Sequence, residues 1–297
     1  MERYIFIVNP ISGTKDKKHI LDLLPLYFKD EDYKIVYTEH VGHATEIANI
    51  AAKAGINVAV AIGGDGTVNE VAQGIVHTET ALGIIPCGSG NGLARHLGYS
   101  MKPQKAIETL KRCHIENCDY GLINHHPFFC TAGVGFDAEV SDTFAKAGKR
   151  GLPTYVKTTL EVGIKYKGEK LDIEFDDGEK IQGEKFWLVT AGNAAQYGND
   201  FFITPDASLR DGYLDVNLWS TFNKIKSPVV GIELHQGWII KNKEVRIKRC
   251  KKVIIHREHE GAIQRDGDPA WGPKDVVMEI VEGGIKMVVG NPCKNNL

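Results

Sequence analysis

The apolar positions in the first part of the chain follow two alternating patterns. Short continuous apolar runs predict buried strands, and apolar residues three or four positions apart predict helices between them. The run at 58–62 is apolar throughout, which is typical of a central parallel strand with both faces covered. The expected order is strand 5–8, helix 20–27, strand 35–37, helix 44–52, strand 58–62, helix 68–75 and strand 82–85. Short turns separate these segments, so the sequence predicts a doubly wound open α/β sheet.

From about residue 118 strand-like runs dominate, and Gly-containing turns separate several of them. These runs lie at 128–131, 171–175, 186–190, 214–219, 244–247, 252–256 and 276–281. One helix is expected at 153–166. This pattern predicts an antiparallel β-sandwich or barrel. We therefore expect two domains, 1–120 and 121–284.

Composition agrees with an ordinary globular protein, because 42% of the 297 residues are hydrophobic and 25% are charged. The formal net charge of −2 gives no sign of a nucleic-acid partner. The six cysteines form no Cys-x-x-Cys pair, which favours reduced thiols in a cytoplasmic protein. The chain has no apolar stretch of about 20 residues, and its first residues lack the basic leader of a signal peptide. We expect a soluble protein that at most lies on a membrane surface.

A glycine-rich loop, Gly63-Gly64-Asp65-Gly66-Thr67, directly follows the third predicted strand and precedes a helix. Glycines let a main chain approach a polyphosphate, and a helix N-terminus offers N–H groups to it. Asp65 would repel phosphate unless it binds Mg²⁺ or accepts a proton. The alternative is a tight turn in which Thr67 is the N-cap and Glu70 completes a capping box. The phosphate interpretation better explains an acid placed among glycines.

Two similar loops follow neighbouring strands, at 9–13 and 86–95. Loops after the carboxyl ends of parallel strands meet at one edge of the sheet, so the three should converge. Their expected hydrogen-bond donors are Ser12, Thr67, Ser89 and Asn91. The loops match neither a Walker A motif nor the dinucleotide fingerprint.

The motifs NPISG, GGDGT and P-x-GSGN-x-LAR, in this order, resemble those of the diacylglycerol kinase-like lipid kinases. The resemblance continues at 133–138, 205–215 and 266–269. It implies a nucleotide-binding α/β domain and a β-sandwich domain with the active site in the cleft between them. It also implies that residues 285–297 return to the first domain.

The resemblance further implies that the enzyme uses ATP and Mg²⁺. The implied nucleotide-binding residues are Asn9, Thr38, Gly63, Gly64, Asp65, Gly66, Thr67, Asn69, Glu70, Gly88, Ser89 and Asn91. Asp65 is expected near the transferred phosphate and its Mg²⁺. Different branches of the family place the catalytic base at the position of Asp268 or at that of Asp65, and this chain has an acid at both. Without the resemblance, residues 266–269 would be interpreted as a plain turn.

Two further sites are implied. Bacterial members hold a structural Mg²⁺, whose matching ligands here are the Ser208 and Tyr213 carbonyls and the Asp211 carboxylate. A metal-free Asp-Gly hairpin turn is the alternative. Asp137 is a candidate for the polar head group of the substrate, and an Asp that caps the next helix is an equal alternative.

Two segments have strongly biased charge. Residues 241–257 hold eight basic residues and one acid, and residues 169–184 hold seven acids and two lysines. The basic segment is either a hairpin with charged edge strands or a patch that docks on anionic lipid. The acidic segment is expected to be a solvated hairpin that faces away from the membrane.

Together these features predict an ATP- and Mg²⁺-dependent kinase acting on a lipid hydroxyl. Diacylglycerol is the expected acceptor, and a sphingoid base is the second candidate because of the Asn91-Gly92 pair. The expected partner is a lipid at the inner face of the membrane, with peripheral contact and no nucleic acid, and a homodimer is compatible with this class. The alternatives are a kinase of the NAD-kinase type with a soluble substrate and a non-catalytic nucleotide or lipid sensor.

Overall fold

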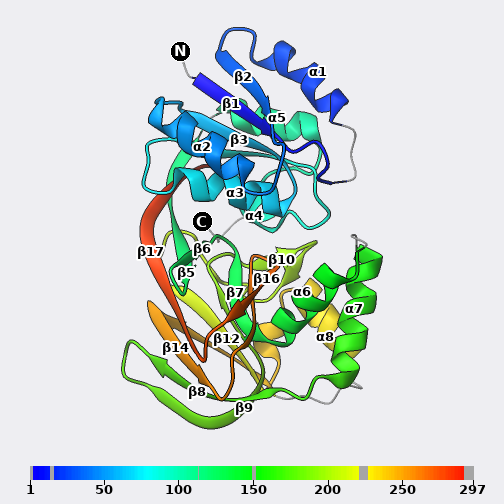
Figure 1. Ribbon diagram of the computed structural model, residues 1–297, viewed down its shortest axis with the longest axis vertical. Coiled ribbons are helices and arrows are strands. Elements are labelled where there is room, and N and C mark those ends of the chain that lie inside the picture. Colours follow the sequence, from blue (N-terminus) through cyan, green and yellow to red (C-terminus); the bar gives the residue numbers. More distant parts are fainter. Residues whose placement is uncertain (1–2, 14–16, 113, 149–151, 221–226, 291–297) are drawn as a thin grey trace. The chain divides into compact units, whose positions relative to one another are not determined.

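The computed structural model describes residues 3–13, 17–112, 114–148, 152–220 and 227–290, and the chain divides into two compact units. Unit 1 contains the chain up to Asp119 and the stretch that begins at Glu282, and unit 2 contains Tyr120–Val281. In Figure 1 the blue and cyan elements belong to unit 1, and the green to orange elements belong to unit 2. The last residues, 291–297, lie outside the described part, as do Cys113 and Cys293.

Unit 1 is built on a parallel sheet with the strand order β2-β1-β3-β4 and the end of β17 beside β4. Its strands are β1 (Arg3–Val8), β2 (Asp32–Tyr37), β3 (Val58–Gly63) and β4 (Ala81–Pro86), with the last residues of β17 (Asp275–Val288). Every residue of β3 and β4 is buried, as predicted for central strands. The register places Val8 beside Ile62 and Ile62 beside Ile85, so these three strands end at the same edge.

Five helices of unit 1 connect or follow these strands: α1 (Lys18–Tyr27), α2 (His43–Lys53), α3 (Asp65–Ile75), α4 (Gly92–His96) and α5 (Pro103–Arg112). Helix α2 packs on α3, and α1 packs on α5. Right-handed crossovers from β1 to β2 and from β2 back to β3 place their connecting helices on opposite faces of the sheet. Helix α2 ends at Lys53, and Gly55 follows its C-cap residue with φ +71°, the left-handed conformation typical of a glycine after a helix.

Unit 2 is an antiparallel β-sandwich, as predicted. One path of paired strands runs β16-β15-β7-β9-β8-β14-β17, and β12 joins β9 to β13. Strand β9 (Lys180–Gly192) pairs with β8 through its first half and with β7 and β12 through its second half. The core between the strands is apolar and includes Phe128, Val189, Val216, Ile255 and Met278.

The remaining strands have the following bounds: β5 (Ile115–Ile123), β6 (His126–Phe128), β7 (Thr131–Gly135), β8 (Glu169–Phe175), β10 (Gln196–Gly198), β11 (Phe201–Phe202), β12 (Leu214–Ser220), β13 (Val245–Cys250), β14 (Lys252–Arg257), β15 (Gly261–Arg265) and β16 (Asp268–Gly272). Strand β5 runs across the Asp119/Tyr120 division, and β17 runs across the second division, at Val281/Glu282.

The helices of unit 2 were only partly predictable. Helix α7 (Leu152–Lys165) matches the expected segment, but α6 (Phe136–Lys146) and α8 (Ser227–His235) were not expected. Helix α8 contains a proline, a glycine and β-branched residues, which disfavour helix, and it packs through Val230 against a second apolar cluster around Trp187 and Trp219. Within the described part of the chain, no helix is both long enough and apolar enough to cross a bilayer.

Candidate active site

Three loops of unit 1 pack backbone against backbone at the carboxyl ends of β1, β3 and β4. Gly13 has φ +72°, and a Cβ there would collide with the carbonyl of Cys87. A Cβ on Gly88 would lie 2.7 Å from the Cα of Gly64. These approaches require glycine, so the three loops predicted from the sequence do converge.

Asp65 joins the second of these loops to the third. One carboxylate oxygen accepts the N–H of Asn91 at 2.9 Å, and the other accepts the N–H of Gly92 at 2.8 Å. Burial raises the pKa of Asp65, whereas the two N–H groups and the nearby charge of Arg95 act to lower it. The carboxylate therefore has a fixed orientation and a strengthened affinity for a proton.

Thr67 has a buried hydroxyl with no hydrogen-bond partner among the described residues. The capping-box interpretation is wrong, because α3 already begins at Asp65 and has no side-chain cap. Glu70 instead accepts the N–H of Ala44 at 3.1 Å, at the start of α2. A buried hydroxyl without a partner costs about 1–3 kcal/mol, so a ligand oxygen at this place would remove that cost.

The other predicted nucleotide-binding residues fall into two groups. Some residues shape the loops. Asn91 has φ +54°, and its side-chain amide accepts the N–H of Gly88 at 2.9 Å and donates to the carbonyl of Gly88 at 2.8 Å. Asn9 likewise accepts the N–H of Ile11 at 3.2 Å through its own amide oxygen. The others differ in exposure: Thr38, Gly63 and Asn69 are buried, Gly64 is half-buried, and Gly66 and Ser89 are exposed.

A cleft of about 440 Å³ lies beside these loops, and its lining was not predicted from the sequence. Pro10 and Tyr37 come from the ends of the first two strands, and Lys17 and Lys18 from the start of α1. The ammonium of Lys17 donates to the carbonyl of Ser12. These two lysines bring positive charge to a cleft that also contains one acid, Asp22. They lie just beyond the 9–13 loop, but they belong to none of the glycine motifs.

In unit 2, residues 265–268 form a tight hairpin between β15 and β16. Asp266 and Gly267 have φ of 52° and 84°, the left-handed pair typical of a type I′ turn, and Arg265 pairs with Asp268. The backbone is therefore the turn that composition alone suggested. The Asp266 carboxylate, however, accepts the N–H groups of 129–131 at 2.9, 2.6 and 3.0 Å. Burial, together with the charge of Asp268, raises its pKa to about 6.

Asp268 is exposed at the start of β16, and buried hydrogen bonds hold the hairpin that carries it. The side chain of Gln264 accepts the N–H of Gly267 at 3.0 Å and donates to Asp137 at 3.2 Å. Asp268 thus projects from a turn fixed by buried hydrogen bonds, as a reacting carboxylate would need.

Asp137 is the centre of the buried hydrogen-bond network. It is 7% exposed and accepts hydrogen bonds from Thr190 at 2.6 Å, from Tyr197 at 2.9 Å and from Gln264. Its other oxygen accepts the N–H of Ala138 at 2.9 Å, in the first turn of α6. Burial raises the pKa of Asp137. Helix α6 has Gly135 at its N-cap and no side-chain cap, so Asp137 does not cap it. A role for Asp137 in binding a substrate head group stays a prediction.

The predicted metal loop lies between unit 2 strands. One oxygen of Asp211 accepts the N–H of Tyr213 at 3.1 Å, and the other pairs with Arg249. The hydroxyl of Ser208 accepts the N–H of Arg210 at 3.2 Å.

Among the described residues, one group of three metal-ligating side chains has its ligand atoms together: His40, His43 and Glu46. The ring nitrogen Nδ1 of His43 accepts the N–H of Glu39 at 3.0 Å, so the proton of the neutral ring lies on Nε2. That nitrogen would have to lose its proton before it could bind a metal.

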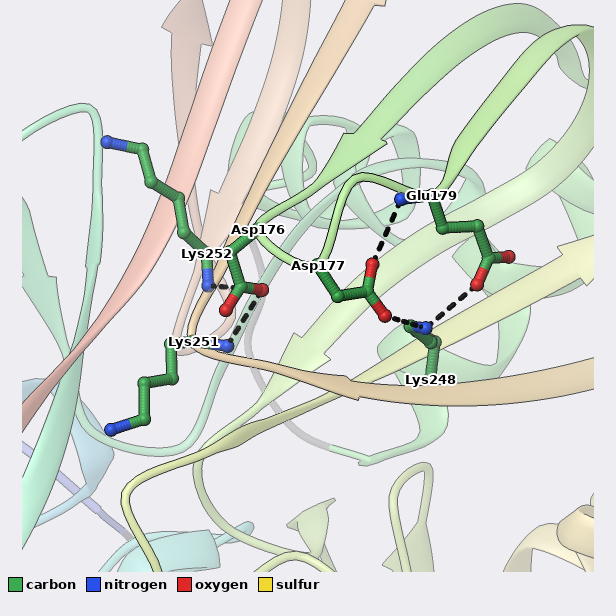
Figure 2. Close-up of polar contacts among 6 residues, drawn as sticks. All are labelled: Asp176, Asp177, Glu179, Lys248, Lys251 and Lys252. Atoms are coloured by element: carbon green, nitrogen blue, oxygen red, sulfur yellow. Dashed lines mark hydrogen bonds and ion pairs between the residues drawn. The ribbon is translucent and has the colours of Figure 1, made fainter.

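The basic and acidic segments turn out to pair with each other. Figure 2 shows the ammonium of Lys248 between Asp177 and Glu179, with Glu179 at 2.8 Å. Asp176 accepts the backbone N–H groups of Lys251 and Lys252 at 3.2 and 3.3 Å (Figure 2). Elsewhere in the segment Arg246 pairs with Glu184, and Lys252 with Glu279. Much of the basic charge is therefore neutralised within unit 2, which weakens the interpretation as an anionic-lipid patch.

Comparison with known proteins agrees with these features. Residues 3–123 match the family model described as the diacylglycerol kinase catalytic domain, and residues 130–289 match the model described as the YegS C-terminal NAD kinase beta sandwich-like domain. The chain therefore belongs to the diacylglycerol kinase-like lipid kinase family and is a kinase-type phosphotransferase.

Named relatives match over most of their length. The diacylglycerol kinase of Bacillus subtilis strain 168 is 29% identical over 90% of both chains. A Chromohalobacter salexigens protein named "Probable lipid kinase YegS-like" is 28% identical over 77% of this chain and 75% of the relative.

Solved structures share the fold. A crystal structure of a diacylglycerol kinase from Bacillus anthracis strain Sterne has a TM-score of 0.71 at 21% identity, covering 98% of this chain and 97% of that chain. Another solved chain from the same strain has a TM-score of 0.81 at 23% identity, covering 98% of this chain and 96% of that one.

Proposed function

We propose that this enzyme transfers the γ-phosphate of ATP, with Mg²⁺, to the hydroxyl of a membrane lipid. Diacylglycerol is the first acceptor, and a sphingoid base is the second because of the Asn91-Gly92 pair. The observation that carries the proposal is the buried hydroxyl of Thr67, which has no partner among the described residues and lies in the first turn of α3, next to the closely packed glycine loops.

The residues of unit 1 fit a nucleotide phosphate chain. The first N–H groups of α3 have no carbonyl partner within the helix, and Thr67 lies in this first turn. Lys17 and Lys18 add positive charge at the neighbouring cleft. Bound Mg²⁺ would neutralise phosphate oxygens, and Asp65 is the carboxylate of this edge that could hold it.

We assign the general base to Asp268. Each oxygen of Asp65 accepts one backbone N–H, from Asn91 or Gly92, which holds the carboxylate at the phosphate loops and leaves a lone pair for Mg²⁺. Asp268 is exposed on a hairpin that Asp266 and Gln264 hold in place. A carboxylate so fixed can accept the proton of the lipid hydroxyl as the oxygen attacks phosphorus.

The alternative of a soluble acceptor has one specific observation in its favour: the model matched by residues 130–289 is described as NAD kinase beta sandwich-like. The test offers labelled ATP and Mg²⁺ with diacylglycerol, sphinganine, ceramide or phosphatidylglycerol in mixed micelles, and NAD in buffer. Labelling of diacylglycerol is the expected result. Labelling of NAD alone would overturn the lipid proposal, and nucleotide binding with no labelled acceptor would favour a sensor.

A further inference from the structure

The loop 208–213 carries the ligand set that the family resemblance implies for a structural Mg²⁺, but its only carboxylate is occupied. One oxygen of Asp211 accepts the N–H of Tyr213 at 3.1 Å, and the other pairs with the guanidinium of Arg249. Mg²⁺ requires a carboxylate oxygen at about 2.0–2.1 Å in near-octahedral geometry. The guanidinium stands where that cation would have to approach, so the donor set does not fit the metal.

The strand register holds Arg249 at this place. Strands β12 and β13 are antiparallel, and Asp215 lies directly opposite Arg249. The Nε of Arg249 lies 3.3 Å from a carboxylate oxygen of Asp215, whose side chain is only 4% exposed. The guanidinium also lies over the ring of Tyr213, 4.8 Å from its centroid. Two carboxylates and an aromatic face therefore surround the half-exposed guanidinium, a combination that suits arginine.

The local charges fit an internal cation. The ammonium of Lys251 also lies over Tyr213, 5.6 Å from its centroid. A divalent ion at Asp211 would have to displace Arg249 or lie beside its positive charge, and both are costly.

We propose that in this chain the guanidinium of Arg249 takes the place of a structural divalent cation at the 208–213 loop. The loop is closed by salt bridges to Asp211 and Asp215, and it binds no Mg²⁺ of its own. Arg249 is a stabilising residue here, remote in sequence from the loop and brought to it by the β12–β13 pairing.

The test measures Mn²⁺ binding by electron paramagnetic resonance, without nucleotide, on chelator-treated protein. The variants are Arg249→Met, Asp211→Asn and the double variant. Arg246→Met is the matched control, because Arg246 lies on the same strand and pairs with Glu184 at 2.8 Å instead. Thermal unfolding in chelator and in millimolar Mg²⁺ provides a second readout for each protein.

We expect wild type to bind no Mn²⁺ that depends on Asp211, and its Tm to be the same in chelator and in Mg²⁺. Arg249→Met should lose several degrees in Tm, regain part of them with Mg²⁺, and bind one Mn²⁺ that the double variant lacks. Arg246→Met should behave as wild type. A wild-type Mn²⁺ site that Asp211→Asn abolishes would overturn the proposal, and so would an Arg249→Met variant that gains no site. The wild-type measurement decides the matter even if Arg249→Met fails to fold.

Discussion

Replacing Asp266 by Asn tests the buried carboxylate that holds the hairpin of Asp268. Three backbone N–H groups, from residues 129–131, donate to its two oxygens. Asparagine offers one oxygen, and its NH₂ group would face an N–H donor. A hydrogen bond to a charged group contributes about 1.5–3 kcal/mol, and an unsatisfied buried N–H costs about 1–3 kcal/mol. We therefore expect the free energy of unfolding to fall by about 2–3 kcal/mol at pH 7.

The pH dependence of this loss has a definite sign. Burial raises the pKa of Asp266 from 3.8 to about 6, so the folded state binds the proton more tightly than the unfolded state. The stability gained is fully present below the unfolded pKa and is lost as the pH rises through the folded pKa. A shift of this size corresponds to about 1–3 kcal/mol after allowance for partial exposure. The difference between wild type and Asp266→Asn should therefore widen by this amount from pH 7 to pH 4.

The assay is urea unfolding followed by tryptophan fluorescence at several pH values between 4 and 7, with Asp177→Asn as the matched control. Asp177 also begins an Asp-Gly turn, but it is exposed, and Lys248 lowers its pKa. Its contribution is present above its unfolded pKa of 3.8 and is lost only below it, so its difference from wild type should stay nearly constant between pH 7 and pH 4. If the Asp266 difference narrowed toward pH 4 instead of widening, the three N–H groups would outweigh burial, and the reasoning would be refuted.

Five further variants have expected outcomes. Gly88→Ala should lower stability by about 1–3 kcal/mol and weaken ADP binding measured by calorimetry, because the two glycine loops must part. Gly66→Ala, whose Cβ meets nothing, should instead raise stability by about 0.5–1 kcal/mol in urea unfolding. Asp268→Asn should lower kcat by about 10²–10⁴-fold and leave ADP affinity unchanged. Asp65→Asn should lose both turnover and Mg²⁺-dependent nucleotide binding. Near-normal turnover of either variant would contradict the role assigned to that residue. Lys248→Gln should leave the binding of anionic vesicles in a sedimentation assay unchanged, because its ammonium is already paired, and a clear loss would restore the lipid-patch interpretation.

The parallel sheet and its loops were predictable because their signals are local. Apolar runs at 58–62 and 82–85 define buried strands, and glycines directly after them define close-packed turns. The start of α3 was placed three residues too late, at Val68, because the helix begins inside the glycine motif itself. That one difference turned Thr67 from a cap into a buried, unpartnered hydroxyl.

Features that depend on long-range pairing were not predictable. The acids at 176–179 and the bases at 248–252 are about 70 residues apart, and antiparallel strands bring them together. Arg249 reaches Asp211 for the same reason, through the β12–β13 register. Helix α8 could not be predicted because its segment has poor intrinsic helix propensity and is stabilised by burial of Val230.

The most direct measurement is the transfer of labelled γ-phosphate from ATP to diacylglycerol in mixed micelles, by wild type and by Asp65→Asn, with and without Mg²⁺. Wild type is expected to produce labelled phosphatidic acid only when Mg²⁺ is present. The Asp65→Asn variant is expected to produce none under either condition. Labelled lipid from Asp65→Asn at the wild-type rate, or no labelled lipid from wild type while NAD is phosphorylated, would contradict it.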